Sequence, residues 1–175
     1  MLGVLPIGMT TPEHTQQVVT AQRQVAAGAD LIFGLVADPA EQPRWDGNDN
    51  LAEAPAGQRV RAVGDVFVMR LTNGKDRENH VVELEEGRRI AWRPASPGEE
   101  PAGHLWRWEL EPLDATHTLV THTYDWSELR DEARLARARA TTADMLAASV
   151  DRLAALAERL DAAARHAAGE EEVAG

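Results

Sequence analysis

The segment that most constrains the fold is residues 103–126, GHLWRWELEPLDATHTLVTHTYDW, which has the pattern of two strands joined by a tight turn. Side chains two positions apart lie on the same face of a strand. One face of this hairpin is then mostly aromatic and apolar: Trp106, Trp108, Leu110, Val120, His122, Tyr124 and Trp126. A turn at residues 114–116 places Trp108 opposite His122 and Trp106 opposite Tyr124. The pattern predicts a hairpin with an aromatic ladder on one face.

Three further strands are predicted before this hairpin, at residues 65–71, 76–85 and 89–93. Asn73-Gly74 is a strong signal for a two-residue hairpin turn. That turn pairs Phe67 with His80 and Met69 with Glu78. A three-residue turn around Gly87 pairs Leu84 with Ile90 and Val82 with Trp92.

These pairings sort the side chains of five strands into two separate sets. The inner set adds Phe67, Met69, Leu71, Glu78, His80, Val82, Leu84, Ile90 and Trp92 to the residues of the aromatic hairpin. The outer set is charged: Arg70, Arg77, Glu83, Arg89, Arg93, Arg107, Glu109 and Asp125. Such separation predicts an antiparallel sheet with one buried face.

The segments outside the meander predict one more strand and several helices. Residues 15–25 read as a first strand, and Asp30 is positioned to cap a short helix over residues 31–37. A second short helical turn follows near Trp45, and residues 48–62 leave room for a short strand. Residues 135–165 lack Gly and Pro and carry apolar residues at three- and four-residue steps. They predict one long amphipathic helix.

Composition limits the classes of function. A chain of 175 residues with a net charge of −11 has the size of one domain, and the charge argues against nucleic acid or an anionic membrane surface as partner. It contains no cysteine, which excludes disulfides, thiolate nucleophiles and cysteine-based zinc sites. No apolar run reaches the length of a membrane span. We expect a disordered lead at residues 1–14, one domain at residues 15–165, an acidic flexible tail at residues 166–175, and a cytoplasmic location.

The order of strand, two short helices, long meander and closing helix resembles the START-like helix-grip superfamily, also labelled SRPBCC or polyketide cyclase/dehydrase and lipid transport. The residues that carry the resemblance are DLIFGLVADPAEQPRWDG, ENHVVELEEGRRIAWRP, THTYDW and RARATTADMLAASVDRLAALAE, within residues 15–162. The resemblance implies an α+β fold in which a seven-stranded sheet wraps around the long helix. It also implies a cavity for an apolar ligand between the two.

The candidate site residues are those that face this expected cavity. The candidates for acid–base chemistry are His80, Glu78, His122 and Tyr124, although each of them can instead be an ordinary core or surface residue. The candidates for ligand binding are Trp45, Phe67, Met69, His80, Trp92, Trp106, Trp108, His122, Tyr124, Met145 and Ser149. We expect no cofactor and no metal site, since His80 and His122 lie on strands too far apart to share an ion.

Three functions remain open at this stage. The first is a binding or carrier protein, monomeric or homodimeric, for a small aromatic or lipid-like molecule. The second is an enzyme of the polyketide cyclase or dehydratase type, working without metal. The third is an interaction domain of the chaperone-activator kind, in which an outer surface of the domain, and not the cavity, carries the function. The fold alone does not choose among them.

Overall fold

A computed structural model describes residues 16–173 of the protein, so the lead predicted for residues 1–14 lies outside the described residues. Seven strands form one antiparallel sheet in the order β1-β7-β6-β5-β4-β3-β2. The strands are β1 (Val18–Val25), β2 (Leu51–Glu53), β3 (Val66–Leu71), β4 (Asp76–Glu85), β5 (Arg89–Ala95), β6 (Leu105–Pro112) and β7 (Thr118–Asp125). The helices are α1 (Ala29–Ala37), the short 3₁₀ helix η1 (Pro39–Glu41), α2 (Gln42–Trp45), α3 (Glu132–Ala140) and α4 (Ala143–Val173).

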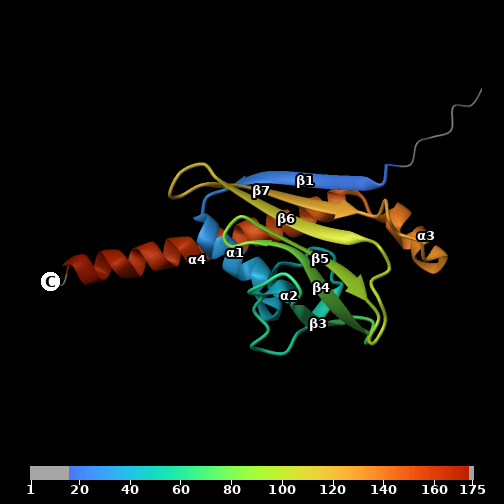
Figure 1. Ribbon diagram of the computed structural model, residues 1–175. Helices are drawn as coiled ribbons and strands as arrows, with labels where there is room; N and C mark the ends of the chain where they lie inside the picture. The colour runs from blue at the N-terminus through green and yellow to red at the C-terminus, as the bar shows by residue number, and fades with distance from the viewer. Residues whose placement is uncertain (1–15, 174–175) are drawn as a thin grey trace, which may run out of the picture.

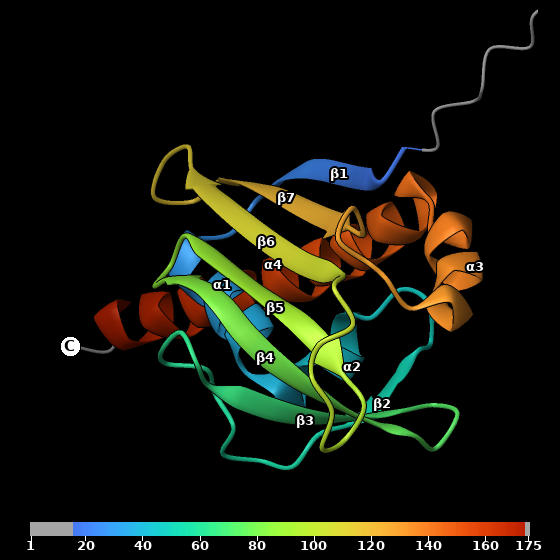
Figure 2. The ribbon, with the colours of Figure 1, turned by 45° about the vertical axis from the view of Figure 1, so that its right-hand side comes forward.

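The sheet curves around α4, which crosses one side of it (Figures 1 and 2). The core between them contains Val25, Ile32, Val36, Phe67, Ile90, Trp108, Val120, Val150 and Leu153, all with at most 1% exposure. The α+β helix-grip fold implied by the resemblance is therefore confirmed. Within residues 16–173, no helix combines the length and the apolar composition that a bilayer span requires.

The predicted register of the aromatic hairpin is confirmed. Trp108 pairs with His122 and Trp106 with Tyr124 across β6 and β7. The backbone N–H of Leu113 donates to the carbonyl of His117 at 2.9 Å, which encloses the turn at residues 114–116. The aromatic side chains thus occupy one face, as alternation along each strand requires.

The predicted register of β4 is wrong at its first half. Phe67 pairs with Asn79, and His80 lies between Val66 and Arg93 on the outer face. The turn between β3 and β4 has three residues, 72–74, because the backbone N–H of Leu71 donates to the carbonyl of Lys75. Gly74 at a φ of 82° permits this turn.

A β-bulge then restores the predicted register in the second half of β4. Val81 pairs with Trp92 but Glu83 pairs with Ala91, so Val82 is the extra residue. Val82 therefore does not pair with Trp92, whereas Leu84 and Ile90 pair as predicted. The bulge reverses which face each side chain of residues 76–81 occupies. Arg77 and Asn79 consequently point inward, while Glu78 and His80 point outward.

The helices also differ from the prediction in three places. The cap of α1 is Gly28, which makes no side-chain hydrogen bond, and Asp30 lies inside the first turn. The single helix predicted at residues 135–165 is two helices, because Thr141 is extended at the end of α3 and Thr142 Oγ1 accepts from the N–H of Met145. Helix α4 then continues to Val173, where the sequence predicted a flexible tail after residue 165.

Candidate functional site

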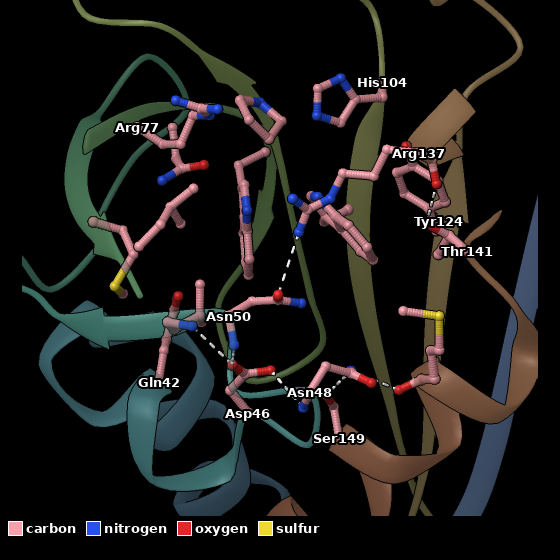
Figure 3. Close-up of a pocket in the computed structure, with 18 of the residues that line it drawn as sticks. Gln42, Asp46, Asn48, Asn50, Arg77, His104, Tyr124, Arg137, Thr141 and Ser149 are labelled. Atoms are coloured by element: carbon pink, nitrogen blue, oxygen red, sulfur yellow. Dashed lines mark hydrogen bonds between the residues drawn. The ribbon is translucent and has the colours of Figure 1, made fainter. Parts of the chain in front are cut away.

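A cavity of about 490 Å³ lies between the inner face of the sheet, α3, the first turns of α4 and the loop after α2 (Figure 3). Nine of the residues predicted to bind a ligand line it: Trp45, Met69, Trp92, Trp106, Trp108, His122, Tyr124, Met145 and Ser149. The strands supply the aromatic side chains through their alternation. Helix α4 contributes only three side chains to the lining, those of Met145, Leu146 and Ser149. These side chains are smaller than the aromatic rings that they face across the cavity.

Three predicted site residues do not line the cavity. Phe67 is buried and packs its ring edge-on against Trp92, with centroids 5.4 Å apart. His80 and Glu78 lie on the outer face because of the three-residue turn and the bulge in β4. The Glu78 carboxylate accepts from the backbone N–H of Gly98 at 3.2 Å in an exposed loop. His80 and Glu78 therefore have no contact with this cavity.

A continuous row of rings forms the floor of the cavity. The His122 ring stacks on Trp108, with centroids 3.8 Å apart and planes 12° apart, and on Trp106 at 5.5 Å. Trp106 in turn stacks on Tyr124 at 4.2 Å. Trp45 packs edge-on against Trp108 at 5.0 Å. Because the stacked rings cover one another's faces, they form a rigid and largely buried apolar floor.

His122 is held neutral with one nitrogen available. Its Nδ1 lies 3.0 Å from the carbonyl oxygen of Arg107, and a carbonyl can only accept, so Nδ1 carries the proton. The Nε2 atom is then an acceptor. Burial lowers the pKa of His122 to about 4, which the hydrogen bond to Arg107 opposes only in part. At neutral pH this residue offers the cavity a hydrogen-bond acceptor and no charge.

Tyr124 and His104 are the other polar rings of the lining. Burial raises the pKa of Tyr124 to about 12, so its hydroxyl keeps its proton. His104, at the start of β6, is 9% exposed, and its Nδ1 is buried without a hydrogen-bond partner. Burial, followed by the charges of Arg134, Arg77, Arg137 and Arg93, lowers the pKa of His104 to about 4.

The loop after α2 closes the opposite end of the cavity and is tied to α4. The Ser149 hydroxyl accepts from the backbone N–H of Gly47 at 3.0 Å, and the Asn48 amide donates to the Met145 carbonyl at 2.9 Å. The Asp46 carboxylate accepts from the N–H groups of Asn50 and Leu51 at 2.6 and 2.8 Å. Trp45 donates its indole N–H to the Leu35 carbonyl at 2.9 Å. These contacts make Trp45 a packing anchor for this loop.

Five cationic and polar residues of the lining are not among the candidates predicted from the sequence: Asn79, Arg77, His104, Arg134 and Arg137. The predicted register places Arg77 on the outer face of β4, which is wrong. Arg134 and Arg137 lie on α3, which the sequence did not separate from α4. The position of His104 was predictable, because His104 lies two residues before Trp106 and so has the alternation of the inner face. Figure 3 shows Arg77, His104 and Arg137 at one end of the cavity, and Asp46, Asn48 and Ser149 at the other.

The chemistry available in the cavity is apolar contact and hydrogen bonding. His122 accepts, Tyr124 donates, and the arginines supply positive charge at one end. Among residues 16–173, no group of three or more His, Asp or Glu side chains is placed to hold a metal ion.

Comparison with solved structures places the fold among known helix-grip proteins. The chain matches the protein MLL2253 from Mesorhizobium loti with a TM-score of 0.60 at 18% identity, covering 82% of this chain and 98% of that one. It matches a START superfamily protein from Mycobacterium smegmatis with a TM-score of 0.59 at 18% identity, with the same coverage. At these identities the similarity concerns the fold.

Sequence comparison gives a closer relationship. The uncharacterized protein Rv0088 of Mycobacterium tuberculosis is 32% identical over 111 residues, which are 62% of this chain and 47% of that protein. The chain thus spans about half the length of the curated relatives it matches. The model of one family, described as polyketide cyclase / dehydrase and lipid transport, matches residues 16–158, which contain every strand, α3 and half of α4. The chain belongs to the polyketide cyclase / dehydrase and lipid transport family.

Proposed function

We propose that the protein binds a small hydrophobic molecule, aromatic or lipid-like, in the cavity between the sheet and α4. The observation that carries this proposal is a cavity of about 490 Å³ floored by stacked rings. Ligand pockets commonly measure about 300–1,000 Å³ and combine apolar walls with a few polar groups. Membership of a family whose description includes lipid transport supports the same function.

Binding fits the polar groups of this cavity better than acid–base catalysis. A general base works best with a pKa near the operating pH. His122 has a pKa of about 4 and Tyr124 of about 12, so the first is a weak base and the second a weak acid near neutral pH. His80 and Glu78, which would have supplemented them, lie outside the cavity. The polar rings are suited to orienting a ligand by hydrogen bonds.

The test is to narrow the cavity from α3 without touching the core. Ala140 lines the cavity and is exposed, so Ala140→Trp places an indole at its edge. Ala136 is exposed on the same helix but does not line the cavity, so Ala136→Trp is the matched control. The neutral fluorescent probe 1-aminoanthracene should bind the parent protein. Ala140→Trp should weaken binding by about tenfold or more, equivalent to about 1.4 kcal/mol, and Ala136→Trp should not.

Two outcomes would contradict the proposal. One is that the parent protein binds no probe and releases no small molecule in native mass spectrometry of material purified from its source. The other is that both tryptophan variants weaken probe binding equally, since that would place the probe on the surface of α3. Thermal melts of each variant establish that the fold is intact before binding is compared.

A further inference from the structure

One end of the cavity collects positive charge in a chain that is strongly acidic. Four cationic side chains line the cavity, Lys75, Arg77, Arg134 and Arg137, against two carboxylates, Asp46 and Asp131. The whole chain has a net charge of −11. The sign of the charge at this end of the cavity is therefore opposite to that of the chain as a whole.

The two carboxylates do not neutralise this end. Asp46 lies at the opposite end, and its oxygens accept from the backbone N–H groups of Asn48, Asn50 and Leu51. Asp131 pairs with Arg134, with its Oδ2 3.1 Å from Arg134 Nε. Within residues 16–173, no carboxylate lies within salt-bridge distance of Arg77 or Arg137.

Arg77 and Arg137 also keep most of their hydrogen-bond donors. A guanidinium has five N–H donors. Arg77 donates from Nη1 to the Asp76 carbonyl at 2.9 Å, and Arg137 donates from Nη2 to the Asn50 side chain at 3.3 Å. These are the only hydrogen bonds that the two guanidinium groups make in the described part of the chain, so both forks remain available to a ligand.

His104 is a buried polar ring at this end of the cavity. It is 9% exposed, lines the cavity, and its Nδ1 has no partner. A buried polar atom without a partner is costly unless a ligand or water satisfies it. The pKa of Arg77 is lowered by burial and then by the charges of Arg134 and Arg137, which places the three arginines within electrostatic reach of one another. One bound anion would relieve this repulsion.

We propose that the cavity binds an amphipathic carboxylate, whose apolar body lies on the stack of Trp106, Trp108 and His122 and whose carboxylate lies among Arg77, Arg137 and His104. This inference rests on the proposed function of the cavity. A carboxylate fits this end because its two oxygens match the planar fork of a guanidinium. Arg134 is already paired with Asp131, so Arg77 and Arg137 are the guanidinium groups left for the head group.

The experiment compares two fluorescent probes that differ only in the head group. They are 11-(dansylamino)undecanoic acid and its methyl ester, titrated into the parent protein at low salt. The acid should bind at least about tenfold tighter than the ester, since charge-assisted hydrogen bonds are the stronger ones. Raising the ionic strength should weaken binding of the acid and leave the ester nearly unchanged.

Variants locate the head group. Arg77→Met and Arg137→Met should each weaken binding of the acid by about tenfold and leave the ester unchanged. The matched control is Arg139→Met, which removes the same charge from the same helix but from a side chain that does not line the cavity. It should alter neither probe. If Arg77→Met fails to fold, Arg137→Met carries the test, because Arg137 is exposed.

The outcomes separate this inference from the function on which it rests. Equal affinity for acid and ester, with no effect of the arginine variants, would overturn the carboxylate and leave a cavity for neutral ligands. Failure of both probes, together with 1-aminoanthracene, would overturn the proposed function itself. Competition by dodecyl phosphate at least tenfold stronger than by dodecanoate would assign the head group to phosphate and refute the carboxylate.

Discussion

At the residue scale, two buried histidines are expected to make the protein less stable in acid. His122 lies between two indoles with its Nδ1–H on a backbone carbonyl, and His104 lies beside arginines at the cationic end of the cavity. Both have pKa values near 4, against 6.5 for an ordinary histidine. Between about pH 4 and pH 6.5, the folded state therefore binds fewer protons at these two histidines than the unfolded state does.

Protonation of the unfolded chain should consequently lower the free energy of unfolding as the pH falls from about 6.5 to about 4. Above pH 7 both states are neutral at these positions and their contribution is constant. Each histidine contributes a loss of up to roughly 3 kcal/mol across that window. Urea unfolding at a series of pH values measures the slope, which should shrink in His104→Gln and His122→Gln.

His166→Gln is the control, since His166 is exposed near the end of α4. Its stability should follow the slope of the parent protein. A parent slope that survives both buried substitutions would show that other groups produce the acid sensitivity.

At the element scale, β4 marks the limit of what the sequence could predict. The alternation in β3, β5, β6 and β7 placed the ring residues correctly because each of those strands keeps one period throughout. In β4, adjacent Val81 and Val82 allow either side chain to point inward. Val81 is buried at 2% exposure, whereas Val82 is the extra residue of the bulge and is 36% exposed. A turn one residue longer than Asn73-Gly74 suggests is compatible with the same sequence, since Gly74 permits it. Local pattern therefore could not decide between His80 and Asn79 as the inward residue.

The cationic end of the cavity could not be predicted for two reasons: the register of β4 and the break between α3 and α4. Arg77 reaches the cavity only because of the register of β4, and Arg134 and Arg137 only because α3 ends at Ala140. The ATT sequence at residues 140–142 has no Gly or Pro to signal a break. Tertiary packing decides that break, and helix propensity is too weak a signal to reveal it.

A close approach of the loop after α2 to α4 gives an element-scale prediction. A Cβ on Gly47 would meet the carbonyl oxygen of Ala148 and the N of Ser149, both at 2.5 Å, and these are backbone atoms that cannot turn aside. Gly47→Ala should therefore destabilise the protein by about 1–3 kcal/mol, the usual cost of overpacking. It should also loosen the loop that closes the cavity. Urea unfolding measures the first effect and probe affinity the second.

The matched variant is Gly34→Ala, inside α1, where an added Cβ meets nothing within 4 Å. It should be neutral or stabilise the protein by about 0.5–1 kcal/mol, because alanine favours the helix. Equal effects of the two variants would mean that α4 can shift to accommodate the loop.

At the scale of the whole molecule, the cavity is lined by residues from both the sheet and the helices. Its lining comes from α2 and the loop after it, from six strands, from α3 and from α4. These segments are far apart in the sequence and meet only when the sheet closes on the helix (Figure 2). The unfolded chain retains no such site. A ligand of the cavity is therefore linked to global folding and not to a local element.

Binding should accordingly raise the melting temperature of the entire domain. A ligand that binds only the folded state, present at 100 times its Kd, adds about 2.7 kcal/mol to the free energy of unfolding. For a chain of this size that corresponds to a shift of roughly 5–10 °C. Circular dichroism melts with saturating 1-aminoanthracene should show this shift in the parent protein and in Ala136→Trp, but not in Ala140→Trp. Fluorescence that reports saturation of the parent without any change in its melting temperature would show that the probe binds folded and unfolded chains alike, as a surface contact does, and would remove the cavity from consideration as its site.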